Sequence, residues 1–342
     1  MRLSSPELVK EFVLKKGEAR LSAVYRLFNR REAGADLKLR THAEFTPGGQ
    51  VSSDDGCFYP VGPSGKRIPF RVGHASPFFE NLGGWLAVCD AGRRKGVIQT
   101  FRTNAVGKLY YCMSEQACNF EATTPEEQVA PGQALEFACD WGLIQGVSGV
   151  AGYAAGVAVE IATPESGVFG RGAAVPLVIE ATALWPVDCL ARIAIERPDG
   201  SRTNLHAATW RLAPDAPIRL PLDWNTGRLP DGDYRIVVDL RIPDGSPLLT
   251  TVRELRLAGD RQAALHAETQ PWRERLQERI ATSRALADGE AREREMAGAT
   301  RLAVLLNAYE AAVAATDAAA IEALRGDIQW LLDPPEDHAP AE

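Results

Sequence analysis

The sequence lacks the short motifs that most often assign an enzyme to a reaction class. It contains no G-x-G-x-x-G and no G-x-x-x-x-G-K-[ST], and its nearest approach to G-x-S-x-G fails because Val150 follows Gly149. Dinucleotide, P-loop and serine-hydrolase chemistry are therefore not indicated. None of the six cysteines has a partner at C-x-x-C spacing, so we expect no metal site and no cofactor.

Long apolar runs and clusters of basic residues are also missing. No segment approaches the roughly 20 apolar residues of a membrane helix, and the first residues lack the order of a signal peptide. We therefore expect no membrane partner and, by default, a cytoplasmic location. The net charge of -7 argues against nucleic acid as a partner, because nucleic-acid binding depends on clustered Lys and Arg. The densest basic run, Arg93-Arg94-Lys95, is predicted to be the solvated turn of a hairpin.

The cysteines lie mostly in apolar segments that resemble strands. Cys89 ends the run 86–89, and Cys139 ends the run 135–139. A reduced thiol packs in such a place as a small apolar side chain. The even number of cysteines also permits disulfides, but we favour reduced cysteines in the core.

Short alternating segments, separated by turn residues, fill the first part of the chain. Residues 20–28 alternate with a period near two, which predicts a strand, and residues 37–41 resume the alternation after a polar turn, which predicts a hairpin. Further strands are predicted at 84–89, 96–101, 109–112 and 134–141. Short strands at this spacing favour an antiparallel β-sandwich, which we place at residues 1–165.

A second set of strands is predicted between residues 174 and 258, separated by three Pro-Asp-Gly turns at 198–200, 230–232 and 243–245. The segment Leu229–Ile236 resembles the L-x-D-G-x-Y entry of immunoglobulin-like and fibronectin-like modules, in which Tyr234 would pack or cap a corner. We therefore place an immunoglobulin-like β-sandwich at residues 166–258. The whole chain is expected to be mostly β.

The last part of the chain, residues 259–342, changes to a helical pattern. Apolar residues at three and four spacing predict helices at 271–286 and 292–315 and a third helix from a cap at Asp317 through Trp330, followed by a disordered C-terminal end. A small helical hairpin or bundle packed on a neighbouring surface is favoured. The alternative is a coiled-coil arm through which the chain oligomerises.

The segment Arg40–Gly49 carries the best candidates for chemistry. His42 and Glu44 are two residues apart on a predicted strand and so share one face. A histidine there can act as a general acid and a carboxylate as a base. The same spacing also suits an ordinary exposed His and Glu beside a turn, so both interpretations stay open.

Residues 10–145 resemble the galactose mutarotase-like supersandwich of aldose 1-epimerases and of polysaccharide-active proteins. The resemblance lies in VYRLFNR, THAEF, the strand at 83–88 and the Pro-Gly turn before the strand at 134–141. It covers only the second half of such a fold, which implies a non-catalytic relative or a fragment of a longer protein. By this resemblance His42 matches the acid that protonates the sugar ring oxygen, and no base is assigned.

Sugar binding needs a flat aromatic ring with polar groups around it. Candidates in the sequence are Asp54, Asp55, Tyr59, Trp85 and Trp141. We therefore expect a carbohydrate-recognition or scaffolding module of a polysaccharide-processing protein, with carbohydrate as its partner. The alternatives are an epimerase-like or lyase enzyme that uses His42 as acid, and a structural adaptor without a ligand.

Overall fold

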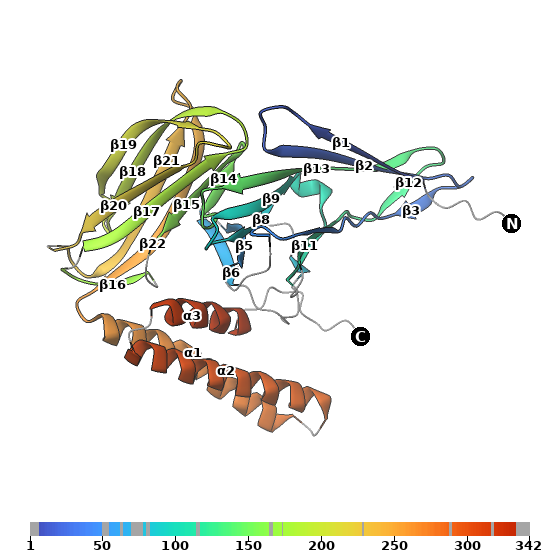
Figure 1. Ribbon diagram of the computed structural model, residues 1–342. Helices are drawn as coiled ribbons and strands as arrows, with labels where there is room; N and C mark the ends of the chain where they lie inside the picture. The colour runs from blue at the N-terminus through green and yellow to red at the C-terminus, as the bar shows by residue number, and fades with distance from the viewer. Residues whose placement is uncertain are drawn as a thin grey trace.

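The computed structural model describes residues 7–49, 55–61, 64–69, 78–79, 83–113, 117–163, 167–172, 174–227, 229–286, 289–315 and 318–332. Strands dominate up to residue 258, and helices follow (Figure 1). The predicted fold class, mostly β with antiparallel sheets and a helical C-terminal segment, is confirmed.

The first sandwich is built from a seven-stranded and a four-stranded sheet. In sheet order the larger consists of β1 (Glu7–Leu14), β2 (Arg20–Phe28), β13 (Ala134–Gln145), β9 (Lys95–Phe101), β8 (Trp85–Asp90), β5 (Asp55–Val61) and β6 (Ser64–Pro69). The smaller consists of β4 (Ala43–Phe45), β11 (Cys118–Thr123), β10 (Lys108–Met113) and β7 (Phe78–Phe79). Buried side chains of both sheets, among them Phe120 and Phe137, form one apolar core.

The predicted strand at 20–28 is confirmed as β2, but the predicted hairpin with residues 37–41 is wrong. β2 pairs with β1 and β13. The short strand β3 (Ala35–Leu37) pairs instead with β12 (Glu127–Val129). The polar segment after Phe28 does not turn back, because Asn29 is buried and its side chain donates to the carbonyl oxygens of Ala33 and Val129.

The second sandwich has a four-stranded and a five-stranded sheet. The first is formed by β14 (Gly152–Ala154), β15 (Val157–Ala162), β17 (Ala174–Ala183) and β20 (Ile218–Asn225). The second is formed by β16 (Val168–Gly170), β22 (Pro247–Ala258), β21 (Gly232–Arg241), β18 (Val187–Glu196) and β19 (Arg202–Leu212). A single apolar core lies between them. Because β14 and β15 pair with this unit, we propose that the boundary between the sandwiches lies before residue 152 rather than near 165.

Tyr234 lies in the corner of this second sandwich. Its side chain is fully buried beside Trp224, and its hydroxyl donates to the carbonyl oxygen of Pro230 at 2.9 Å. The expected role of Tyr234 in packing and capping a turn is therefore confirmed.

An apolar seam joins the two sandwiches. Trp85, Ile98 and Ile144 of the first sandwich pack with Ala158 and Leu184 of the second. The buried carboxylate of Glu180 accepts from the backbone nitrogen of Ser148 at 2.6 Å and from its hydroxyl at 2.8 Å. Arg94 of the predicted basic turn also reaches Glu180, at 3.0 Å. As predicted, this turn joins two paired strands, β8 and β9. One of its arginines, Arg94, nevertheless contacts the seam rather than only solvent.

The helices α1 (Arg261–Ala285), α2 (Glu290–Ala315) and α3 (Ala318–Leu332) pack together beside the second sandwich (Figure 1). α1 begins before the predicted start at Pro271, because the side chain of Asp260 caps it by accepting from the Ala263 nitrogen. Val168 of β16 joins the helical core. The predicted cap at Asp317 and the C-terminal end after Leu332 lie outside the described residues. No described helix is both long and apolar enough to span a bilayer.

Candidate functional site

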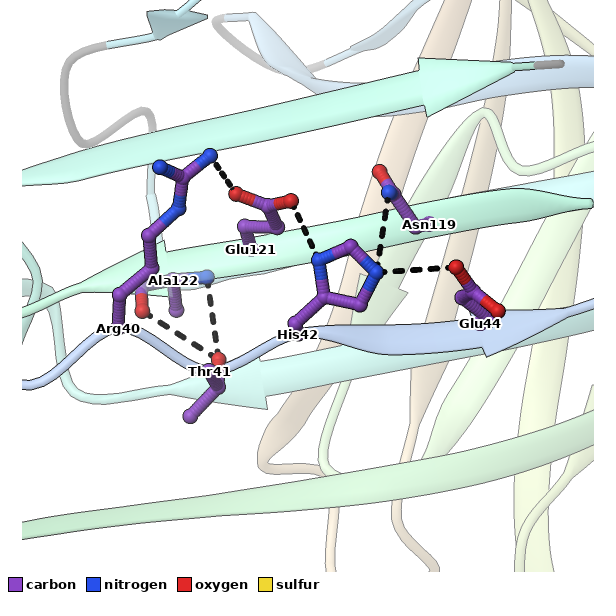
Figure 2. Close-up of polar contacts among 7 residues, drawn as sticks. All are labelled: Arg40, Thr41, His42, Glu44, Asn119, Glu121 and Ala122. Carbon is purple, nitrogen blue, oxygen red and sulfur yellow. Dashed lines mark hydrogen bonds and ion pairs between the residues drawn. The ribbon is translucent and has the colours of Figure 1, made fainter.

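His42 lies between two carboxylates at the edge of the small sheet (Figure 2). Its Nδ1 is 2.6 Å from Glu121 Oε1, and its Nε2 is 3.1 Å from Glu44 Oε1. The other carboxylate oxygen of Glu121 forms an ion pair with Arg40. Asn119 lies beside the ring, with Nδ2 3.5 Å from His42 Nε2. The predicted pair of His42 and Glu44 is thus side by side, and a second acid joins it.

Strand pairing brings these residues together. β4 runs antiparallel to β11, with Glu44 opposite Asn119. The pairing continues toward Arg40, since the Thr41 nitrogen donates to the Ala122 carbonyl and Thr41 also binds Ala122 through its hydroxyl. Alternate residues of paired strands share a face. Arg40, His42 and Glu44 therefore lie on the same face as Asn119 and Glu121.

The charges of this cluster are balanced around a buried acid. The Glu121 side chain is only 4% exposed, whereas the His42 side chain is 52% exposed. A buried carboxylate requires charged or hydrogen-bonding partners, and here Arg40 and His42 supply them. The hydrogen bond to Glu44, followed by that to Glu121, raises the pKa of His42 above its ordinary value of 6.5. The imidazole therefore keeps its proton to a higher pH and can donate from both nitrogens.

An aromatic groove lies against the same segment. It has a volume of about 480 Å³ and lies between β1, β2 and β13 on one side and residues 39–43 on the other. Three aromatic rings line it, those of Phe12, Tyr25 and Trp141, together with Arg40 and His42. Phe12 packs edge-on against Tyr25, with ring centroids 6.1 Å apart.

Trp141 is held in place by the core beneath the groove. Its ring stacks on Phe120 at 6.2 Å and meets Phe45 edge-on at 6.3 Å. One part of the ring thus packs inside the sandwich while another lines the groove. An aromatic ring that is anchored in this way loses little conformational entropy when a ligand covers it.

Of the other predicted sugar-binding residues, Trp85 has a described side chain, and it does not line this groove. Trp85 is 6% exposed and packs in the seam, near Tyr153. Asp55 and Tyr59 belong to β5, which β8 and β9 separate from β13 in the sheet, and their side chains lie outside the described part of the chain. Asp54 lies wholly outside the described residues.

Sequence reasoning misses four residues of this region. Glu121 is 79 residues away from His42 and lies in the segment CNFEAT, where nothing marks it as a partner of a histidine. No sequence pattern marks Phe12 and Tyr25 as residues of a groove, and Arg40 is only the first residue of the candidate segment. The one usable signal is alternation, since Arg40, His42 and Glu44 share a face.

No family model and no curated protein sequence matches this chain. Among solved structures, a Bacteroides uniformis β-glucuronidase aligns with 68% of this chain and 26% of its own length, at 11% identity and a TM-score of 0.25. A putative β-galactosidase from Bacteroides fragilis aligns with 70% of this chain and 32% of its own, at 12% identity and a TM-score of 0.25. A Niemann-Pick type C2 protein from the Japanese carpenter ant aligns with 32% of this chain and 94% of its own, at 11% identity and a TM-score of 0.23. Similarity at this level assigns neither a family nor a ligand to the chain.

Proposed function

We propose that the aromatic groove beside residues 39–43 binds carbohydrate and that the chain is a recognition module of a polysaccharide-processing protein. The observation that carries this proposal is the combination of three aromatic rings, Phe12, Tyr25 and Trp141, with charged groups on the adjoining segment. A pyranose ring has an apolar face that stacks on aromatic rings and a rim of hydroxyls that needs donors and acceptors. The groove offers both kinds of contact.

The polar groups suit hydroxyl recognition. Arg40 and His42 line the groove, and Glu44 and Asn119 adjoin His42. Arg40 and the protonated imidazole donate, the carboxylate accepts, and the amide does both. The groove volume of about 480 Å³ lies within the range of about 300–1,000 Å³ that is usual for small-ligand sites.

Binding of soluble polysaccharides and oligosaccharides, measured on a glycan array and then by calorimetry, tests the proposal. Phe12→Ala removes a ring that is 53% exposed, so the fold should tolerate the change. We expect Phe12→Ala to weaken binding about tenfold or more, as the loss of about 1.4 kcal/mol at a central contact would.

Leu143→Ala is the matched control, because Leu143 is 65% exposed on the same strand as Trp141 and does not line this groove. Its affinity should equal that of the unmodified chain. Equal losses in both variants, or binding that neither Phe12→Ala nor Trp141→Ala weakens in folded protein, would refute the assignment of the groove.

A second candidate function is an epimerase-like or lyase reaction with His42 as the acid. The favouring observation is the position of the imidazole between Glu44 and Glu121, which raises the pKa of His42. Polarimetry on freshly dissolved aldoses tests for mutarotation, and ultraviolet absorbance tests for the unsaturated products of a lyase. Acceleration that His42→Gln abolishes would support catalysis, whereas binding without acceleration favours recognition alone.

The third possibility is a structural adaptor without a ligand, and the absence of both binding and catalysis in these assays would favour it.

We propose that the second sandwich is an immunoglobulin-like spacer under each of these three alternatives. Its support is the Tyr234 corner and the parallel pairing of β16 with β22 beside otherwise antiparallel strands.

A further inference from the structure

β1 lies at the edge of its sheet and carries a concentration of exposed apolar side chains. β1 is the first strand of its sheet, and among the described strands it pairs only with β2. Five of its eight side chains are large, apolar and exposed: Leu8 (44%), Val9 (37%), Phe12 (53%), Val13 (43%) and Leu14 (71%). An uncovered strand edge of this kind is a template for pairing with another strand.

We propose that β1 pairs antiparallel with β1 of a second copy of this chain, so that one continuous sheet runs through a two-fold symmetric dimer. This inference does not depend on the proposed carbohydrate site. It rests on the sequence and exposure of one strand.

Symmetry restricts how two β1 strands can pair. The two-fold axis must be perpendicular to the sheet, so each face of the strand continues into the same face of the partner strand. Leu8, Lys10, Phe12 and Leu14 share the face of the groove, and Glu7, Val9, Glu11 and Val13 share the other. Residues opposite one another must therefore come from the same set.

One allowed register makes the strand complementary to itself. When Glu11 lies opposite its own copy, Val9 faces Val13 and Leu8 faces Leu14. Lys10 then faces the ring of Phe12, a favourable cation–π arrangement. Glu7 faces Lys15, which directly follows the strand. Each of these four pairs occurs twice because of the symmetry, and each is of a kind that stabilises antiparallel sheets.

The neighbouring registers are poorer. One places Lys10 opposite Lys10 and Glu7 opposite Val13. The other places Phe12 opposite Phe12 but sets Glu11 against Val13 and Lys10 against Leu14. Charged residues face each other or face apolar residues in both, which disfavours pairing. Reciprocal matching in a single register favours a second copy over an unrelated strand.

The favoured register brings two Glu11 side chains together on the axis. The charge of each would be partly offset within its own chain, because Arg26 Nη1 lies 3.1 Å from Glu11 Oε2, although Arg26 Nε also binds Glu136 at 2.8 Å. Arg26→Gln should therefore weaken the dimer although Arg26 itself is not on β1.

Disulfide trapping tests the register. The Cα atoms of directly opposed residues in an antiparallel pair lie about 4.5–5.5 Å apart, which is within disulfide range. Glu11→Cys should form a disulfide-linked dimer on mild oxidation, seen on a non-reducing gel, because position 11 would face its own copy. Lys10→Cys is the control and should not, since position 10 would face Phe12. The unmodified chain, oxidised in the same way, is a second control that shows any dimer linked through the native cysteines. Equal trapping of both variants, or of neither, would overturn the register.

Charge exchange tests the dimer itself by light scattering and sedimentation. The unmodified chain should have the mass of a dimer. Val9→Lys with Val13→Lys should give monomers, because lysines would face lysines, and so should Val9→Glu with Val13→Glu. A mixture of the two variants should restore a dimer, which a folding defect would not allow. A monomeric unmodified chain, or no restoration on mixing, would overturn the proposal. None of these valine variants changes a groove residue.

Discussion

Adding one methyl group at Gly142 should weaken the seam between the sandwiches. A Cβ atom on Gly142 would lie 2.6 Å from Leu184 Cδ1 and 2.8 Å from Ile98 Cγ2. Both neighbours are buried, at 1% and 0% exposure, so neither has free space to move into. Overpacking of this kind costs about 1–3 kcal/mol, and about 0.5–1 kcal/mol returns because Ala suits a strand better than Gly. Gly142→Ala should therefore lower the free energy of unfolding by about 1 kcal/mol, within a range of about 0–2.5 kcal/mol.

The measurement is urea unfolding, followed by tryptophan fluorescence. Gly170→Ala is the matched control: Gly170 also lies in a strand, and an added Cβ there would meet no atom within 4 Å. Its stability should stay equal or rise slightly. In the double variant with Leu184→Ala, the new methyl group should occupy vacated space, so the two losses should not add. Equal stabilities of Gly142→Ala and Gly170→Ala would refute the reasoning.

Three further predictions follow from single side chains. The pKa of His42 is raised above 6.5, so the contacts of its charged ring should stabilise the fold fully below pH 6.5 and less as the pH rises through the raised pKa. In Glu44→Gln, an NMR titration should show a lower pKa for His42. An unchanged pKa would contradict the hydrogen bond to Glu44 as the cause. Burial raises the pKa of the Cys139 thiol to about 11. Iodoacetamide at mildly alkaline pH should therefore leave Cys139 unlabelled in the native protein and label it after unfolding, as peptide mapping can show. Rapid labelling of Cys139 in the native protein would refute its burial. Tyr234→Phe removes the hydroxyl that binds the Pro230 carbonyl and should lower the free energy of unfolding by about 1 kcal/mol. An unchanged free energy of unfolding would show that this hydrogen bond does not stabilise the fold.

Local patterns predict the strands well where one face is buried. β2 is recognisable because its residues alternate, and the Tyr234 corner is recognisable because its turn chemistry is local. Cys139 and Cys189 are buried and reduced, as expected, and Cys89 and Cys118 are also buried. β1 escapes prediction because ELVKEFVL places apolar residues on both faces and every one of them is exposed, so no burial pattern distinguishes it.

Pairing and exposure are harder to predict than strands. The sequence does not indicate that β3 pairs with β12 rather than β2, because that choice depends on contacts about 90 residues apart. For the same reason Glu121 is not recognisable as the partner of His42. Trp85 and Trp141 both sit in apolar strands, and only the packing of the second sandwich buries the former and leaves the latter lining a groove.

β13 carries both the groove and the seam, with Trp141 on one face and Gly142, the next residue, on the other. A single strand thus sets the separation between the proposed binding groove and the seam that leads to the second sandwich. The two sandwiches should tumble in solution as one particle, and a fluorescent label on the helices should keep a constant distance from the groove. Any molecule bound in the proposed groove would therefore keep a fixed orientation relative to the surface of the helices.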